Sequence, residues 1–79
     1  MKIITRDKNY NEIEHEGKYY CQSYEVIIAM TDGKVHLDKR YWNYSTTTST
    51  HLNRFLNIKA GEAKKKVKSG EYVLEDLNT

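Results

Sequence analysis

The chain is 79 residues long with a formal net charge of +2, which limits it to one small domain and argues against a disordered protein. Only 16 residues are Leu, Ile, Val or Phe, so nearly all of them have to enter a single core. The longest apolar run, Val26–Met30, is far shorter than the roughly 20 residues that cross a bilayer, so no membrane partner is expected. The first residues have no apolar core of secretory length, so we expect a cytoplasmic protein, and the single cysteine, Cys21, cannot form an internal disulfide.

Short β-prone segments make up the N-terminal part of the chain. Lys2–Thr5 is rich in β-formers, and Tyr10–Glu14 alternates loosely between apolar and polar side chains. The segment His15–Lys18 contains Gly17 and predicts a turn. We expect one further strand here, or two, to widen the sheet.

The strongest local signal is a hairpin over residues 19–44. Asp32-Gly33 lies between two β-rich runs and is typical of a two-residue type I′ turn. A two-residue loop places Ile28 directly opposite Leu37. This register predicts which side chains share a face, because neighbouring residues of a strand point to opposite sides.

The predicted register divides the hairpin into an apolar and a polar face. The apolar face is expected to form the core and comprises Tyr24, Val26, Ile28, Met30, Val35, Leu37 and Tyr41. On the other face Glu25 lies opposite Arg40 as a pair of opposite charges, with His36 and Asp38 nearby. Such a face is typical of a surface that meets solvent or a partner.

Helical patterns follow the hairpin. A run of hydroxyl residues at 45–50 can supply an N-cap, and Leu52, Phe55 and Leu56 then recur at helical spacing. We expect a helix over about 47–57, ended by Asn57 in a left-handed conformation. A short basic helix is expected over about 60–69, before Gly70, and a C-terminal strand over about 71–77.

These elements predict one α+β domain over residues 1–79. We expect a three- to four-stranded antiparallel sheet, centred on the hairpin at about 19–44 and packed by the helix at about 47–57. The basic helix at about 60–69 and the strand at about 71–77 complete the domain.

No residue pattern indicates catalysis, a metal or a cofactor. His15, His36 and His51 lack the close spacing of metal ligands. Thr50 and His51 are adjacent, and adjacent residues of a helix point in different directions, so they do not form a nucleophile and base. The four glycines are far apart and form no phosphate loop. We therefore expect a protein that is not an enzyme.

Aromatic side chains are crowded near the base of the hairpin, where they serve either the core or a partner. Tyrosine and tryptophan are frequent in interface hot spots because they combine a large contact area with a polar group. The charged residues of the outer face are natural neighbours for them. The predicted partner-binding residues are Tyr19, Glu25, His36, Asp38, Arg40, Trp42 and Tyr44.

A basic segment offers an alternative contact, with nucleic acid. Residues 59–70 contain five lysines and one glutamate, and an acidic segment follows directly. Lysines neutralise phosphates, but this segment lacks the Arg, Asn and Gln side chains that read base edges, so a solvated helix face is the default interpretation. The candidate nucleic-acid contacts are Lys59, Lys64, Lys65, Lys66 and Lys68.

The segments Tyr41–Leu56 and Val67–Asn78 together resemble small uncharacterised proteins of phages and prophages of Gram-positive bacteria. In that group an aromatic-Tyr-Ser-x-Thr-Thr stretch precedes a helix ending in Phe-Leu, and a Lys-Ser-Gly-Glu-Tyr-x-Leu segment lies near the end of the chain. Tyr41–Leu56 and Val67–Asn78 match these patterns, with Asn57 where the group usually has glycine. The resemblance implies an origin more than an activity, and it supplies no catalytic residue.

The resemblance sharpens the expected function. Short phage accessory proteins often bind and block a host protein, including CRISPR nucleases and other defence enzymes. We therefore expect a non-enzymatic protein that occludes a host protein or nucleoprotein in the host cytoplasm, with nucleic-acid binding as the alternative. Self-association through an uncovered sheet edge stays open, because an unpaired strand edge is a template for pairing.

Overall fold

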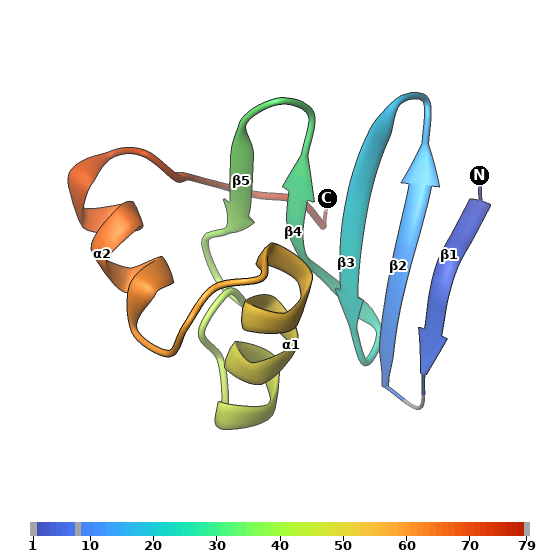
Figure 1. The fold of residues 1–79 in the computed structure, drawn as a ribbon, viewed down its shortest axis with the longest axis horizontal. Coiled ribbons are helices and arrows are strands. Elements are labelled where there is room, and N and C mark those ends of the chain that lie inside the picture. Colours follow the sequence, from blue (N-terminus) through green and yellow to red (C-terminus); the bar gives the residue numbers. More distant parts are fainter. Residues whose placement is uncertain (1, 8, 79) are drawn as a thin grey trace.

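A computed structural model describes residues 2–7 and 9–78 and shows an α+β domain (Figure 1). Within these residues the strands are β1 (Lys2–Asp7), β2 (Tyr10–His15), β3 (Lys18–Ser23), β4 (Val26–Thr31), β5 (Val35–Asp38) and β6 (Val73–Glu75). The helices are α1 (Thr46–Leu56) and α2 (Glu62–Ser69). None of the helices in this part of the chain is long and apolar enough to span a bilayer.

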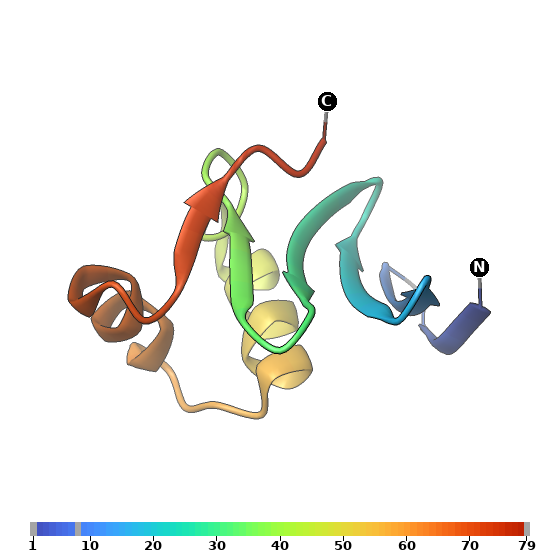
Figure 2. The same cartoon turned by 90° about the horizontal axis from the view of Figure 1, so that it is seen from above.

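The described strands form one six-stranded sheet in the order of the sequence, β1 to β6. The first five strands are antiparallel neighbours, whereas β6 runs parallel to β5. The chain leaves β5, forms α1 across one face of the sheet and α2 beside the edge of the sheet, and returns to the starting end of β5, which makes the last pairing parallel (Figure 2). The α+β class was predicted correctly, but the sheet has more than three to four strands and is mixed.

The strand count was too low because the chain reverses at Tyr24 and Glu25. The backbone of Tyr24 is left-handed, with φ of 57°, and its amide donates to the carbonyl of Asn9 at 2.9 Å. Residues expected to lie on one strand therefore form the two strands β3 and β4. Tyr24, predicted in the core, is 51% exposed. Neither turn residue is a usual turn former, so the sequence carries no signal for this reversal.

The β4–β5 register differs by one residue from the prediction. Ala29, not Ile28, lies opposite Leu37, because the loop contains three residues, Asp32–Lys34, with Gly33 at φ of 102°. Asp-Gly is compatible with loops of either length. A bulge against β3 then leaves Ile28 as the extra residue of β4. Both Ile28 and Leu37 are fully buried although they are not partners.

Strand β5 ends at Asp38, well before the predicted end of the hairpin at 44. The carboxylate of Asp38 accepts hydrogen bonds from the amides of Arg40 and Tyr41, which turns the chain away from the sheet. Glu25 and Arg40 consequently lie in two turns outside the strands and are not cross-strand partners. The predicted charge pair on the hairpin is wrong.

Both helices are close to their predicted positions. The hydroxyl of Ser45 accepts a hydrogen bond from the amide of Thr48 and begins α1. Asn57 ends α1 in the predicted left-handed conformation, with φ of 54°. Helix α2 ends at Gly70, and β6 forms the central part of the predicted C-terminal strand.

The core lies between the sheet and the helices. Leu52 of α1 packs with Cys21, Ala29 and Leu37, one residue from each of three neighbouring strands. Tyr10, Ala63 and Tyr72 extend the core towards β2 and α2. The remaining partly buried side chains around it are Val26, Val35, Tyr41, Trp42, Phe55, Leu56, Ile58 and Val67.

Candidate functional site

The predicted partner-binding residues do not form one surface. Tyr19 is the second residue of β3, whose start lies at the upper end of the sheet in Figure 1, and it is 48% exposed. Glu25, Arg40 and Tyr44 are exposed in connections at the lower end, where β4 starts and β5 finishes. The predicted face is therefore divided between opposite ends of the molecule.

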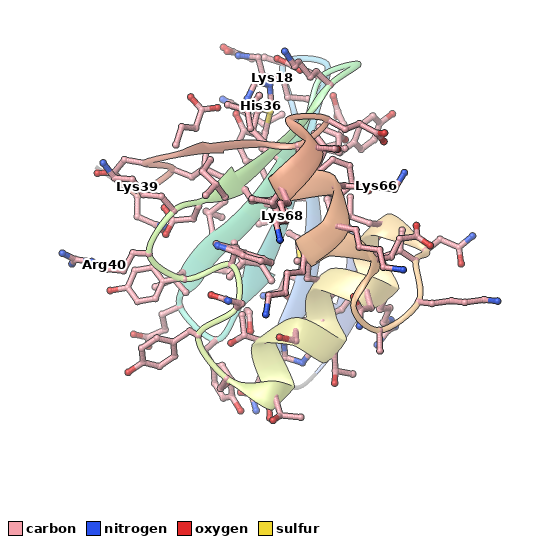
Figure 3. All side chains as sticks on the ribbon, turned by 90° about the vertical axis from the view of Figure 1, so that its left-hand side faces the viewer. Lys18, His36, Lys39, Arg40, Lys66 and Lys68 are labelled. Atoms are coloured by element: carbon pink, nitrogen blue, oxygen red, sulfur yellow. The ribbon has the colours of Figure 1, made fainter. Side chains whose placement is uncertain are left out.

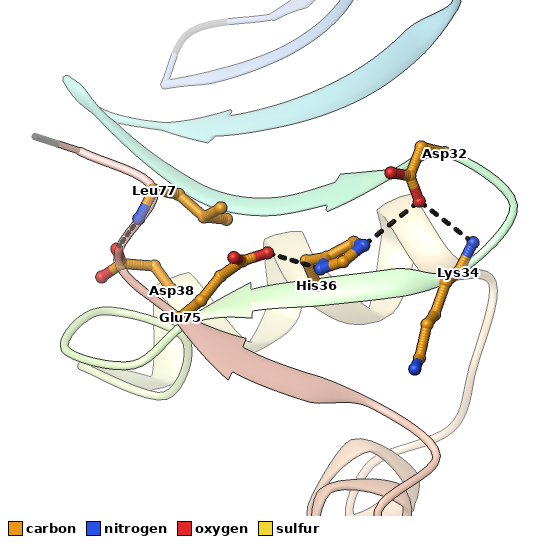
Figure 4. A network of polar contacts seen from close by, with 6 residues as sticks. All are labelled: Asp32, Lys34, His36, Asp38, Glu75 and Leu77. Carbon is orange, nitrogen blue, oxygen red and sulfur yellow. Dashed lines mark hydrogen bonds and ion pairs between the residues drawn. The ribbon is translucent and has the colours of Figure 1, made fainter.

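Asp38 is not a surface residue, because its side chain is only 1% exposed. One carboxylate oxygen accepts from the amides of Arg40 and Tyr41 at 3.1 and 2.9 Å, and the other accepts from the amide of Leu77 at 2.9 Å (Figure 4). Burial alone would raise the pKa of Asp38, but these donors outweigh it and hold the pKa below its ordinary value. Asp38 joins the end of β5 to the C-terminal segment and cannot contact a partner.

His36 is held between two carboxylates (Figure 4). Its Nε2 lies 3.1 Å from Asp32 in the β4–β5 loop, and its Nδ1 contacts Glu75 of β6. Desolvation acts to raise the pKa of Asp32, but the hydrogen bond from His36, the hydrogen bond from the amide of Lys34 and the charge of Lys18 together outweigh it and lower that pKa. The side chain of His36 is only 18% exposed, so its polar atoms serve to tie β6 to the sheet.

Trp42 is half-buried and packs against the core. Three of the predicted partner-binding residues, Glu25, Arg40 and Tyr44, are exposed at the lower end of the sheet. Tyr24 joins them there, because its turn precedes β4. We call Tyr24, Glu25, Arg40 and Tyr44 the tyrosine end. Tyr24 and Tyr44 are 51% and 72% exposed and supply its aromatic area. The sequence pattern missed Tyr24 because the turn that exposes it has no characteristic residue.

A partly buried polar cluster joins α1 to the sheet. The hydroxyl of Ser23 lies 2.7 Å from Nδ1 of His51, and the rings of Tyr10 and Tyr24 lie 5.3 and 6.1 Å from that of His51. The guanidinium of Arg54 lies 4.4 Å above the ring of Tyr10. Ser23 is fully buried, so this serine–histidine pair positions the helix and offers no accessible nucleophile. The pair was missed because its members lie 28 residues apart.

The predicted basic segment divides into paired and exposed lysines. Lys66 donates to Glu71 at 2.8 Å, which raises the pKa of Lys66, and its ammonium lies 5.6 Å from the ring of Tyr72. Lys64, Lys65 and Lys68 are exposed on α2, and Lys59 is exposed in the preceding connection. Figure 3 shows Lys66 and Lys68 on α2, whereas Lys39 and Arg40 project to the other side of the view from the turn that follows β5.

Two surface depressions lie beside the connection between β5 and α1. One, of about 190 Å³, is bounded by α1, α2 and Trp42; its lining is Trp42, Ser49, Leu52, Asn53, Ala60, Gly61, Ala63 and Lys64. We call it the Trp42 groove. The other, of about 320 Å³, lies between the β5–α1 connection and the C-terminal segment; its lining is Asp38, Lys39, Arg40, Tyr41, Asp76 and Asn78. Within the described residues, no three His, Cys, Asp or Glu side chains are grouped as a metal site requires.

The sequence profile of a family of unknown function, DUF8033, matches residues 2–73. The chain belongs to this family. The match spans β1 to β5, both helices and the first residue of β6, so it includes the tyrosine end and the Trp42 groove. No curated protein and no solved structure matches the chain. The membership agrees with the expected similarity to an uncharacterised group, while the phage origin stays a prediction.

Proposed function

We propose that this protein is a non-enzymatic phage accessory protein that binds and blocks a host protein or nucleoprotein through its tyrosine end. The observation that carries the proposal is the exposure of Tyr24 and Tyr44, 51% and 72%, in two connections at the same end of the sheet. Tyrosines held on a folded scaffold give a large contact area with little loss of side-chain entropy.

The charges at the tyrosine end support a protein partner. Glu25 is adjacent to Tyr24, and Arg40 lies in the same connection as Tyr44, and both charged side chains are exposed. Aromatic anchors with charges of both signs around them are typical of transient interfaces, in which the rim sets orientation and the anchors supply affinity. A small domain bound in this way blocks its partner by covering part of the partner's surface. Inhibitors of host-defence enzymes and of CRISPR nucleases act in this manner.

Two sequence features support the biological setting of this proposal. The segments Tyr41–Leu56 and Val67–Asn78 resemble phage and prophage proteins of Gram-positive bacteria. A protein of that origin meets its targets in the host cytoplasm. The first of the two segments includes Tyr44 and the start of α1, so the resemblance covers part of the proposed contact surface.

Affinity capture from the lysate of a Gram-positive bacterium tests the proposal. Tyr24→Ala and Tyr44→Ala remove the two anchors, and Tyr19→Ala is the matched control because Tyr19 is also exposed but lies at the other end of the sheet. We expect the unmodified protein and Tyr19→Ala to capture the same partner. The double variant should lose it, since anchor residues of this kind cost at least about 2 kcal/mol when truncated.

The control variants make the outcome decisive. Circular dichroism and thermal melts have to show that the double variant is folded. A folded double variant that captures the partner as well as the unmodified protein contradicts the tyrosine end. Loss of capture in Tyr19→Ala alone places the interface at the opposite end of the sheet.

Nucleic-acid binding through α2 is the second candidate, and the exposure of Lys64, Lys65 and Lys68 on one short helix favours it. Titration with a random-sequence duplex at low and moderate salt tests it. If these lysines bind phosphates, affinity falls steeply with salt, with a slope near the number of phosphates neutralised. Absence of binding at low salt removes this candidate.

A further inference from the structure

The Trp42 groove combines an apolar interior with a polar rim. Its apolar lining includes Trp42 together with the buried Leu52 of α1 and Ala63 of α2. Ser49 and Asn53 of α1 add a hydroxyl and an amide to the rim. The volume of about 190 Å³ suits one apolar side chain, so the groove resembles a pocket for an anchor residue.

Positive charge borders the groove on one side. Lys64 lines it, and Lys65 and Lys68 are exposed on the same helix, with no ion pair to another described residue. Residues 59–70 contain five lysines against the single carboxylate of Glu62. Only Lys66 is neutralised locally, by Glu71. An occupant that meets this rim favourably is therefore anionic.

We propose that the Trp42 groove binds an acidic segment of a partner protein, which inserts one apolar side chain against Trp42 and places its carboxylates beside the lysines of α2. This site is separate from the tyrosine end and does not depend on it. The pairing of an apolar pocket with a one-sided cationic rim selects a peptide that has an apolar residue among acidic ones.

A nucleic acid fits this arrangement less well. A phosphate backbone tracks cations on both sides of a groove, whereas the α1 side of the groove contributes the uncharged Ser49 and Asn53. The one arginine of α1, Arg54, lies over the ring of Tyr10 instead. Nucleic acid is therefore the alternative that the experiment has to separate from an acidic peptide.

The experiment uses Trp42, the only tryptophan of the chain, as its own reporter. The probe is a short synthetic peptide with one leucine between glutamates, titrated into the protein while tryptophan fluorescence and amide chemical shifts are recorded. We expect a saturable change in Trp42 emission together with shifts at Ser49 and Ala60. Replacing the peptide leucine with glycine, or its glutamates with glutamines, should weaken binding at least about tenfold.

Variants of the protein test each half of the site. Ala60→Leu, at an exposed lining position, fills the groove, and Lys64→Glu reverses the charge of its rim; each should weaken peptide binding at least about tenfold. Lys34→Glu is the matched charge control, because Lys34 is exposed in the distant β4–β5 loop. Tyr24→Ala should bind the peptide normally, which separates this site from the tyrosine end.

Three results would overturn the proposal. The first is absence of a saturable response from the folded protein. The second is equal binding of the leucine and glycine peptides, which would show charge attraction without use of the groove. The third is that a random-sequence duplex binds more tightly than the peptide and that Lys64→Glu weakens this binding. That result would show that the α2 lysines bind nucleic acid.

Discussion

Asp38 shows how one residue determines the fold of two distant segments. Its carboxylate accepts from the amides of Arg40 and Tyr41 next to it in sequence, and from Leu77 and the side chain of Asn78 at the C-terminal end. A buried carboxylate is costly unless its oxygens are saturated by donors. These four donors meet that requirement, so Asp38 both ends β5 and fixes the C-terminal segment.

Asp38→Asn should lower the free energy of unfolding by about 3 kcal/mol, because the carboxamide has one acceptor oxygen where the carboxylate has two. Urea denaturation measures the change. Asp76→Asn is the control, since Asp76 is exposed and, within the described residues, accepts a hydrogen bond only from the amide of Asn78. Equal stability of the two variants would contradict the assigned role of Asp38.

The lowered pKa of Asp38 makes stability depend on pH in the acid range. On acidification the unfolded chain binds a proton near its ordinary pKa of about 3.9 before the folded chain does, so the stabilising contribution is present above that pH. It is lost as the pH falls through the lower folded pKa. Thermal melts between about pH 5 and pH 2 should therefore decline in the unmodified protein and decline less steeply in Asp38→Asn. Parallel slopes would refute this assignment.

At the scale of elements, helix α1 has a cap at each end that the chain supplies locally. Ser45 accepts from the amide of Thr48, and Asn57 adopts a left-handed conformation while its amide bonds to the carbonyls of Arg54 and Asn53. Local caps explain why the limits of α1 were predicted to within one residue. Strand β6 is different, since its place in the sheet depends on His36 and on the segment after it.

Two substitutions at Asn57 should have opposite effects on stability. Asn57→Gly should leave the free energy of unfolding unchanged or raise it by up to about 1 kcal/mol, because glycine adopts φ of 54° without strain. Asn57→Ala should lower it by about 1 kcal/mol, the cost of a left-handed conformation for a residue with a Cβ. Chemical denaturation distinguishes the two, and the reverse order would show that α1 does not end as described.

Asn78 should hold β6 and the start of β4 together. Its side chain accepts from the amide of Ile27 at 2.8 Å and donates to the carbonyl of Ile27 at 2.9 Å, in the manner of a neighbouring strand. In Asn78→Ala, hydrogen exchange at Ile27 and in β6 should accelerate at least about tenfold while β2 and β3 change little. Asn43→Ala, at an exposed position in the β5–α1 connection, is the control and should leave the exchange unchanged.

At the scale of the molecule, the core is a single layer between one sheet and two helices. Cys21 lies at its centre, fully buried against α1, and burial raises the pKa of its thiol. The thiol is therefore protonated and shielded in the folded protein. It becomes reactive only when the helix layer separates from the sheet.

A thiol reagent should modify Cys21 at least about a hundredfold more slowly in the native protein than in the unfolded chain. With increasing urea, the labelling rate should rise in parallel with the global unfolding followed by circular dichroism. Fast labelling without denaturant would show that the helices open independently of the sheet.

The sequence predicted the local elements better than their tertiary arrangement. Periodicity and capping residues located α1, and Gly70 marked the end of α2. The turn at Tyr24 was missed because its left-handed residue is neither glycine nor asparagine. The predicted β4–β5 register was wrong by one residue because Asp-Gly is compatible with loops of different length. The bulge at Ile28 in β4 compensates for this shift, so that Ile28 and Leu37 are both buried.

The candidate site was only partly predictable for a related reason. Glu25, Arg40 and Tyr44 were identified as exposed from their types and positions, and the structure places them at one end of the sheet. Asp38 and His36 were assigned to the same surface because the predicted register places them on the face opposite Leu37 and the other core side chains. Their partners, Leu77 and Glu75, lie far away in sequence, so no local pattern could reveal that they are held inside the fold.

The sequence by itself determined the α+β class and the approximate limits of both helices. These depend on interactions between residues a few positions apart. The tertiary structure alone decided the parallel pairing of β6 with β5, the burial of Asp38 and the position of Trp42 in one groove with residues of α2. Each of these requires residues from separate elements to come together, and the free energy that selects them comes from packing and from saturating buried polar groups.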